Sequence, residues 1–284
     1  MRILVTGCNG QLGSEIRKIS PEFSDYEFVF LSKKELNISD KKNVLSFFKE
    51  NSFYALINCA AYTNVNNAEK DIKTAELVNN FGIKNLAIVC RRYSIKLIHI
   101  STDYVFDGSK KSPYIETDIT NPINAYGTSK LNGELSMISV NPKNSIIIRT
   151  SWLYSNYSKN FVKSIISLSK IKSKINVISD QFGSPTNASN LANDVLSLIK
   201  KIDNESVEIY HYSDDGFTSW YKFANEIINL KKIDIKLSKI NSLLYDSHVK
   251  RPKFSALNCT KIKEKFNINL MDWKTSLSIF LNDK

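Results

Sequence analysis

A tyrosine and a lysine stand four residues apart in the segment Asn124-Ala-Tyr126-Gly-Thr-Ser-Lys130. In a helix this spacing places both side chains on one face. A free phenol has a pKa of about 10, and a fixed neighbouring cation favours its ionised form. The pair therefore predicts proton transfer by Tyr126, with Lys130 lowering the pKa of the phenol. Ordinary exposed helices also carry this spacing, so its meaning depends on the rest of the chain.

The composition restricts the classes of protein to consider. A chain of 284 residues can form one large α/β domain or a nucleotide-binding domain with a smaller lobe. The net charge of +11 comes mostly from lysines spread along the chain, which argues against a nucleic-acid partner. No apolar run reaches the ~20 residues of a membrane span, so no membrane partner is expected.

Cysteines and histidines provide no recognisable metal or disulfide pattern. The four cysteines are widely separated and form no C-x-x-C pair, which fits a reducing cytoplasm. His99, His211 and His248 are isolated from one another and from acidic pairs at ligand spacing. The sequence therefore assigns no metal ligands and no histidine-based catalytic triad.

A glycine-rich turn follows the first apolar stretch. Residues 2–6 are expected to form a strand, and a helix is expected from about Ser14. Between them, Gly7 permits a tight turn, Gly10 lets the backbone approach a pyrophosphate, and Gly13 allows the helix to pack closely on the strand. This order predicts a dinucleotide site with the helix N-terminus facing the phosphates.

The next expected strand, residues 26–31, ends at Ser32-Lys33-Lys34. Many dinucleotide-binding folds carry an acidic residue here for the adenosine ribose, and we expect no carboxylate at this point. Ser32 and the two lysines could instead hold a 2′-phosphate. We therefore predict a preference for NADPH, with NADH as the open alternative.

Strands and helices alternate through the first half of the chain. Further strands are expected at residues 54–60, 96–101 and 145–150, with helices at 72–93 and 126–138. This alternation predicts a Rossmann-like doubly wound parallel sheet over residues 1–150. Ala61, Thr102 and Trp152 follow strand ends, where such sheets bind ligands. Thr102 could equally cap a turn, and Trp152 could equally be a core residue.

The remaining chain is expected to form a smaller C-terminal substrate-binding lobe from residues 151–186 and 205–284. Residues 187–204 are expected to pack back on the first domain. Helices are expected at 160–170, 188–201, 219–230 and 273–281, and strands at 175–178 and 207–212. The cleft between the lobes is the expected ligand site.

Several segments together resemble the extended short-chain dehydrogenases/reductases, and the resemblance covers nearly the whole chain. The segments are Gly7-x-x-Gly10-Gln-Leu-Gly13, Ala60-Ala-Tyr-Thr63, Ser101-Thr-Asp-Tyr-Val-Phe-Asp-Gly108, Tyr126-x-x-x-Lys130, Thr150-Ser-Trp152, Asp180-Gln-x-Gly183-Ser-Pro-Thr186 and Arg251-Pro-x-x-Ser255. The third and sixth are far more specific than the glycine turn or the tyrosine–lysine pair.

The resemblance implies reduction of a dTDP-linked 4-keto-6-deoxy sugar. It implies that Tyr126 protonates the keto oxygen, that Lys130 tunes Tyr126 and holds the nicotinamide ribose, and that Thr102 hydrogen-bonds the same oxygen. Matched positions imply cofactor contacts at Gly10, Gln11, Leu12, Asn37, Ile38, Ala61, Tyr62 and Thr63. They imply substrate contacts at Thr102, Asp103 and Trp152.

Arg251 is our own addition to the substrate-binding residues. Its planar fork suits a nucleotide diphosphate, and a structural ion pair is an equal alternative. Asn37 and Asn66 depart from the resemblance, because aspartate would be expected at both positions. The departure at Asn37 could alter an adenine contact, and the sequence gives no meaning for the one at Asn66.

Other readings remain open. The family is associated with Mg²⁺ at a subunit interface, so the resemblance raises Mg²⁺ and a homodimer without assigning ligands. A related enzyme acting on another nucleotide-linked keto sugar, or giving the opposite configuration at C4, is one alternative. A non-catalytic NADP-binding regulatory subunit is another.

Overall fold

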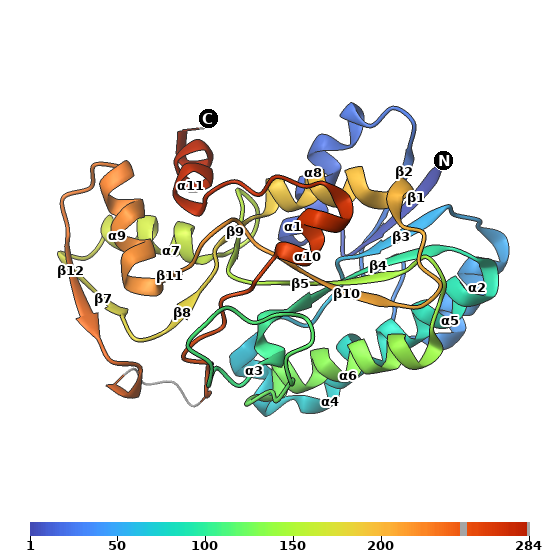
Figure 1. Cartoon of the computed structure of the whole chain (residues 1–284), viewed down its shortest axis with the longest axis horizontal. Coiled ribbons are helices and arrows are strands. Elements are labelled where there is room, and N and C mark those ends of the chain that lie inside the picture. The colour runs from blue at the N-terminus through green and yellow to red at the C-terminus, as the bar shows by residue number, and fades with distance from the viewer. Residues whose placement is uncertain (245–248, 283–284) are drawn as a thin grey trace.

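A six-stranded parallel sheet forms the centre of a computed structural model that describes residues 1–244 and 249–282. The strand order is β10-β5-β4-β3-β1-β2 (Figure 1). The strands are β1 (Arg2–Thr6), β2 (Glu27–Leu31), β3 (Ala55–Asn58), β4 (Lys96–Thr102), β5 (Ile146–Thr150) and β10 (Glu208–Tyr212). The inner strands are apolar runs buried on both faces, as parallel strands between helices must be. The predicted doubly wound sheet is confirmed.

Helices cover both faces of this sheet (Figure 1). One face carries α1 (Gln11–Ile19), α8 (Ala188–Leu198) and α10 (Thr260–Phe266), and the other carries α2 (Lys41–Glu50), α5 (Ile83–Tyr93) and α6 (Ala125–Val140). Alternation along β1 sends Ile3 and Val5 into the first core and Leu4 into the second. Leu4 is fully buried, so its truncation to alanine should cost about 2–5 kcal/mol.

A third, smaller core lies at the other end of the molecule. It forms between α7 (Phe161–Ser169), α9 (Trp220–Leu230), α11 (Trp273–Asn282) and the parallel pair β7 (Lys174–Ile178) and β12 (Lys236–Ile240) (Figure 1). Two short strand pairs are separate from the large sheet: β6 (Leu153–Tyr154) pairs with β9 (Thr186–Asn187), and β8 (Phe182–Gly183) pairs with β11 (Thr218–Ser219). The sequence did not predict β12, α10 or these short pairs.

The helix expected over residues 72–93 is interrupted by a wide turn. It consists of α4 (Ile72–Glu76), the π-helical segment η2 (Leu77–Gly82) and α5. In η2, the Asn79 amide accepts from the Tyr62 backbone N–H at 2.8 Å and donates to the Tyr62 carbonyl at 3.0 Å. It also donates to the Ser129 hydroxyl of α6 at 2.9 Å. The wide turn thus holds the loop after β3 against α6, a common use of π-helical turns beside functional sites.

Candidate active site

Two adjoining pockets open at the carboxyl ends of the central strands. From β1 the chain passes to β2 on one side and later to β3 on the other, which is the switch point where open α/β sheets bind ligands. The pockets have volumes of about 590 and 630 Å³ and share Gly10, Cys59 and Ala61 as lining residues. Together they form one continuous crevice long enough for an extended ligand.

The glycine turn has the geometry expected from its sequence. Gly7 has a φ of +68°, and a Cβ there would lie 2.4 Å from the Ala60 backbone nitrogen. A Cβ on Gly13 would lie 2.6 Å from the Gly7 carbonyl oxygen, so α1 depends on glycine to pack this closely. Gly10 caps α1 with no side chain over the helix N-terminus. The free backbone N–H groups of the first turn therefore suit a pyrophosphate.

Gln11 and Leu12 lie just inside this helix. The Gln11 side chain donates to the Leu153 carbonyl at 3.2 Å and accepts from Ser155 and Asn160 at 3.1 and 3.0 Å. It therefore ties the loop after β6 to α1, and its backbone N–H is the group left for a cofactor. Leu12 is buried and lines the second pocket.

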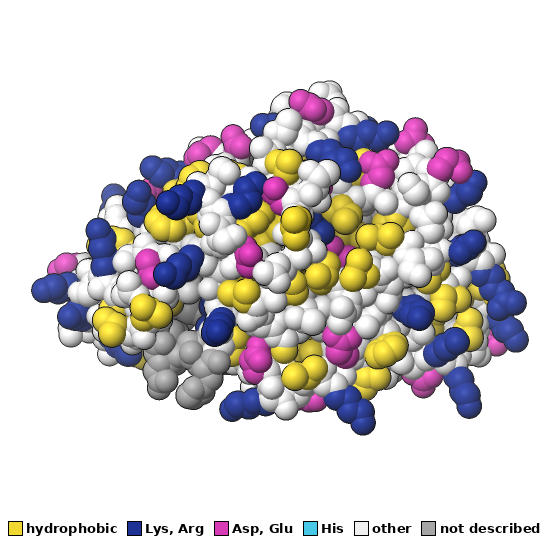
Figure 2. Space-filling model, turned by 60° about the horizontal axis from the view of Figure 1, so that its bottom comes forward, with side chains coloured by type: hydrophobic (Ala, Val, Ile, Leu, Met, Phe, Trp, Pro, Cys, Tyr) yellow, Lys and Arg dark blue, Asp and Glu magenta, His cyan; other side chains and the backbone are white. Residues whose placement is uncertain are grey.

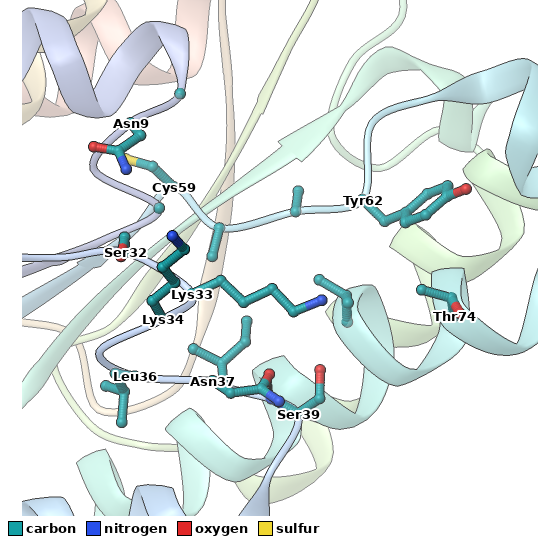
Figure 3. A pocket seen from close by; sticks show the side chains of 16 residues that line it. Asn9, Ser32, Lys33, Lys34, Leu36, Asn37, Ser39, Cys59, Tyr62 and Thr74 are labelled. Atoms are coloured by element: carbon teal, nitrogen blue, oxygen red, sulfur yellow. Dashed lines mark hydrogen bonds between the residues drawn. The ribbon is translucent and has the colours of Figure 1, made fainter.

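The first pocket contains most of the residues expected at the adenosine end of a cofactor. Figure 3 shows the Lys33 and Lys34 side chains extending into it, with Tyr62 on the opposite wall. Asn37 lies at its edge, where its amide oxygen accepts from the Ser39 N–H at 3.2 Å. Ile38 lines the pocket from a buried position.

The segment Ser32-Lys33-Lys34 at the end of β2 has no carboxylate of its own, but one folds back onto it. The Glu35 carboxylate turns back and accepts from the Ser32 backbone N–H at 2.7 Å. It also hydrogen-bonds the Ser32 side chain, and both contacts hold the pKa of Glu35 below its ordinary value. The sequence argument missed this contact because Glu35 is three residues beyond the strand. Ser32 therefore already has an anionic partner beside the two lysines.

The second pocket brings together the expected catalytic residues. Thr102 lies at the end of β4, and Tyr126 and Lys130 lie one turn apart on α6; all three line the pocket, as do Thr63 and Asp103. The Asn124 side chain caps α6 by accepting from the Gly127 N–H at 2.8 Å. A Cβ on Gly127 would lie 2.2 Å from the Tyr104 carbonyl oxygen. This close approach is what sets the first turn of α6 against the turn after β4.

The pKa of Tyr126 departs from the expected direction. Burial raises it to about 12, a hydrogen bond with Thr102 lowers it, and the Asp103 charge raises it. The predicted lowering by Lys130 is wrong for this structure, because the Lys130 ammonium is directed elsewhere: it donates to the Ile100 carbonyl at 2.6 Å. Tyr126 is accordingly held in its protonated form.

The Lys130 ammonium begins a chain of buried polar groups beneath the pocket. Its Nζ lies 3.4 Å from His99 Nε2, and His99 Nδ1 lies 3.0 Å from the Asn58 amide nitrogen. Asn58 in turn accepts from the Thr6 hydroxyl at 2.6 Å. Burial lowers the pKa of Lys130 to about 8, while Glu134, one turn further along α6, raises it. Burial and the Lys130 charge hold the pKa of His99 well below 6.5.

Trp152 forms an aromatic wall of the second pocket. Its ring stacks parallel to Trp220, with centroids 3.4 Å apart. The backbone of Trp152 is left-handed, with a φ of 46°, a conformation that costs a non-glycine residue energy and is often found at functional sites. Gly183 leaves room for the ring on its other side. Sequence reasoning missed Trp220; its place beside the helix cap Ser219 was the available signal.

Arg251 lies outside the second pocket. It donates to the Asn66 amide oxygen at 2.7 Å and hydrogen-bonds the Tyr104 hydroxyl. Tyr104 in turn packs edge-on against Tyr126, with ring centroids 5.7 Å apart. The contact with Asn66 gives that residue, which the sequence left uninterpreted, a role in linking the segment at residue 251 to α3 (Val65–Lys70).

Within residues 1–244 and 249–282, no group of three or more His, Cys, Asp or Glu side chains could hold a metal ion, so Mg²⁺ gains no support. His248 lies outside the described residues. Across that same part of the chain, none of the helices is both long and apolar enough to span a bilayer. The face in Figure 2 carries basic and acidic side chains interspersed rather than a basic stripe.

Comparison with known proteins identifies the family. A family model described as the RmlD substrate binding domain matches residues 1–284. The dTDP-4-dehydrorhamnose reductase of Aggregatibacter actinomycetemcomitans is 38% identical, over 97% of each chain. The dTDP-4-keto-6-deoxy-D-glucose reductase of Streptomyces niveus is 32% identical, over 98% of this chain and 95% of the relative.

A solved structure extends the likeness to three dimensions. The dTDP-4-dehydrorhamnose reductase of Bacillus anthracis, in complex with NADP, is 33% identical and superposes with a TM-score of 0.94, over 100% of this chain and 99% of that one. Family model, sequence and structure agree over the full length. The chain is therefore a member of the dTDP-4-dehydrorhamnose reductase family of oxidoreductases.

Proposed function

We propose that this protein reduces the 4-keto group of dTDP-4-dehydrorhamnose with NADPH and yields dTDP-L-rhamnose for rhamnose-containing surface polysaccharide. The observation that carries the proposal is the meeting of Thr102, Tyr126 and Lys130 in one pocket, at the end of a crevice built for a dinucleotide. The names of full-length relatives supply the substrate class. We place the reaction in the cytoplasm, as the cysteine pattern suggests.

The residues of the crevice fit the cofactor. When bound, NADPH supplies the hydride for the reduction. The open N-terminus of α1 at Gly10 would hold the pyrophosphate, and the first pocket, with Lys33 and Lys34, would hold the adenosine end and its 2′-phosphate. Ala61 and Thr63 would line the path to the second pocket, where Lys130 would hold the nicotinamide ribose.

The chain's own chemical task is to give the keto oxygen a proton. Burial keeps Tyr126 protonated, which is the form a general acid needs before the reaction begins. Thr102 shares a hydrogen bond with Tyr126 and would hold the same keto oxygen. Transfer of the Tyr126 hydrogen to that oxygen turns the developing alkoxide into the sugar hydroxyl and leaves a phenolate.

The substrate would lie between the domain around the central sheet, residues 1–150 with 187–204, and the smaller lobe around α7, α9 and α11. The expected lobe of residues 151–186 and 205–284 loses part of its second segment, because β10 pairs with β5 in the central sheet and α10 packs in the core of that sheet. The stacked rings of Trp152 and Trp220 form a flat surface for the sugar. A further pocket of about 300 Å³ adjoins them between α7 and β7, with Ile175 and Val177 on its walls and Arg251 at its edge. It suits the flat face of a nucleobase, with the attached diphosphate toward the arginine.

The alternative substrate is dTDP-4-keto-6-deoxy-D-glucose, because the Streptomyces niveus relative is a dTDP-4-keto-6-deoxy-D-glucose reductase. The two reactions differ in the configuration of the sugar that enters the pocket. Both would use the same acid, so Tyr126 does not distinguish between them.

The test is loss of NADPH absorbance with purified protein and dTDP-4-dehydrorhamnose, beside dTDP-4-keto-6-deoxy-D-glucose and a GDP-linked 4-keto sugar. We expect rapid oxidation with the first and rhamnose in the product by NMR. Faster oxidation with the second would favour the alternative. NADPH binding without oxidation by any keto sugar would contradict the reductase proposal and favour a regulatory subunit.

A further inference from the structure

Asp103 is a buried carboxyl group beside the proposed acid. It is 2% exposed, and its Oδ1 accepts from the Thr102 hydroxyl at 3.1 Å. The Ser255 hydroxyl also hydrogen-bonds the carboxyl group, and the residue lines the second pocket. A buried carboxyl group is costly and is often found at functional sites.

Thr102 connects this carboxyl group to Tyr126. The Thr102 oxygen accepts from the Tyr104 N–H at 3.2 Å, and its single hydrogen, which is on Asp103 here, can turn to the keto oxygen or to Tyr126 by rotation of the hydroxyl. The same hydroxyl shares a hydrogen bond with Tyr126. Tyr126, Thr102 and Asp103 thus form a continuous chain of three oxygens through which a proton can pass.

A second chain of polar groups begins at Lys130, which lines the second pocket together with Tyr126. Below Lys130, the chain continues to His99, Asn58 and Thr6, each 1% exposed. None of these three lines either pocket of the crevice. Of the two chains, only the one through Thr102 ends at a carboxyl group that lines the second pocket.

We propose that Asp103 is the proton reservoir that restores Tyr126 through Thr102 during each reduction, an inference that rests on the proposed function. After Tyr126 has given its hydrogen to the keto oxygen, the phenolate takes the hydrogen of the Thr102 hydroxyl. Thr102 then takes the carboxylic hydrogen of Asp103. The carboxylate left on Asp103 is reprotonated from water in the pocket, so each turnover consumes one proton from solvent.

The surroundings of Asp103 suit this task. Burial raises its pKa to about 7, and hydrogen bonds from Ser255 and Thr102 lower it. The phenols of Tyr104 and Tyr126 face it, and Arg251 reaches only as far as Tyr104. A carboxyl group with this pKa is partly protonated near neutral pH and recovers its proton readily.

The pH dependence of kcat tests the proposal. With wild type, kcat should be high at low pH and fall as pH rises through about 7, because the reservoir must be protonated. Asp103→Asn keeps an oxygen for Thr102. In this variant kcat should fall at least about 10-fold, and the fall in kcat near pH 7, the limb of the pH profile, should disappear. A variant with unchanged kcat, with the wild-type limb, or with only a raised KM for the sugar would overturn the proposal.

Ser255→Ala gives an independent test in a variant that keeps Asp103. Loss of the Ser255 hydrogen bond should raise the Asp103 pKa, so the fall in kcat should move to higher pH. Infrared titration of the Asp103 carboxyl, with Asp103→Asn as the blank, should show the same upward shift without any substrate. An unmoved limb together with an unmoved infrared titration would overturn the reservoir. A wild type inactive on every keto sugar would instead count against the proposed function.

Discussion

Charged side chains are exposed to water at one end of the crevice and buried at the other. At the first pocket, Lys33, Lys34 and Glu35 are exposed, so water and salt screen their interactions. At the second, Asp103 and Lys130 are buried, and their pKa values shift to about 7 and about 8. Exposed charges can favour NADPH or NADH while costing the fold little stability. Burial, by contrast, moves the pKa values of a carboxyl group and an ammonium group toward neutral pH, where both can take part in proton transfer.

The largest effect is expected where a buried ion pair supports the catalytic helix. Glu134 on α6 accepts from Arg149 through both of its oxygens, at 3.0 and 2.7 Å, and also raises the pKa of Lys130. Glu134→Gln should lower the free energy of unfolding by about 3–5 kcal/mol, because it leaves the Arg149 charge buried without a counterion. Urea denaturation measures this loss.

An exposed pair provides the matched control for that variant. Lys143 and Glu205 lie 2.6 Å apart with 70% and 83% of their side chains exposed. Glu205→Gln should change the unfolding free energy by less than about 1 kcal/mol. Equal effects of Glu134→Gln and Glu205→Gln would contradict the contrast between buried and exposed charge.

A smaller change in the free energy of unfolding is expected for Asp103→Asn, because the buried carboxylate lowers stability. Its pKa rises from 3.8 in the unfolded chain to about 7 in the fold, so the native state binds more protons between these values. Stability therefore falls as pH rises through this window and stays low above it. Asp103→Asn should be more stable than wild type above about pH 7, on the order of 2 kcal/mol, with little difference near pH 4.

Thermal unfolding across this pH range measures the difference, and Asp107→Asn is the control. Asp107 is a nearby aspartate whose pKa is lowered by hydrogen bonds from Ser109. Its replacement should therefore act in the opposite direction and reduce stability near neutral pH. A gain in stability from Asp103→Asn that does not depend on pH would contradict the assignment of the shift.

The smallest effect is expected at the first pocket. Glu35→Gln removes the carboxylate held by Ser32, so the ratio of kcat/KM for NADPH to that for NADH should rise a few-fold. The change should shrink at high salt because the group is exposed. Steady-state kinetics with both cofactors at low and high salt measure it. A ratio that is unchanged, or a change indifferent to salt, would show that this charge does not select the cofactor.

The sequence predicted most of the fold because each signal was local. Apolar runs and the cap residue Ser219 define elements within a few residues of themselves, and the glycine turn has the geometry that its spacing requires. The strand β12 was missed because none of its residues is fully buried, so its apolar pattern is weak. The π-helical turn at Asn79 was missed because its cause is a contact with Tyr62, which is distant in sequence.

The sequence predicted which residues form the site but not how their pKa values shift. Tyr126, Lys130 and Thr102 were identified from spacing and position, and the structure brings them into one pocket. The direction of the Tyr126 pKa shift depends on burial and on where the Lys130 ammonium points, and neither follows from a spacing of four. The same holds for Glu35, whose effect comes from a side chain folding back on Ser32.

The most direct test of the central claim is Tyr126→Phe, measured for both turnover and NADPH binding. The variant removes one oxygen from the second pocket and leaves the first pocket untouched. We predict a loss of kcat of about 100-fold or more, with the dissociation constant of NADPH nearly unchanged. A variant that retains wild-type kcat would contradict the assignment of Tyr126 as the proton donor.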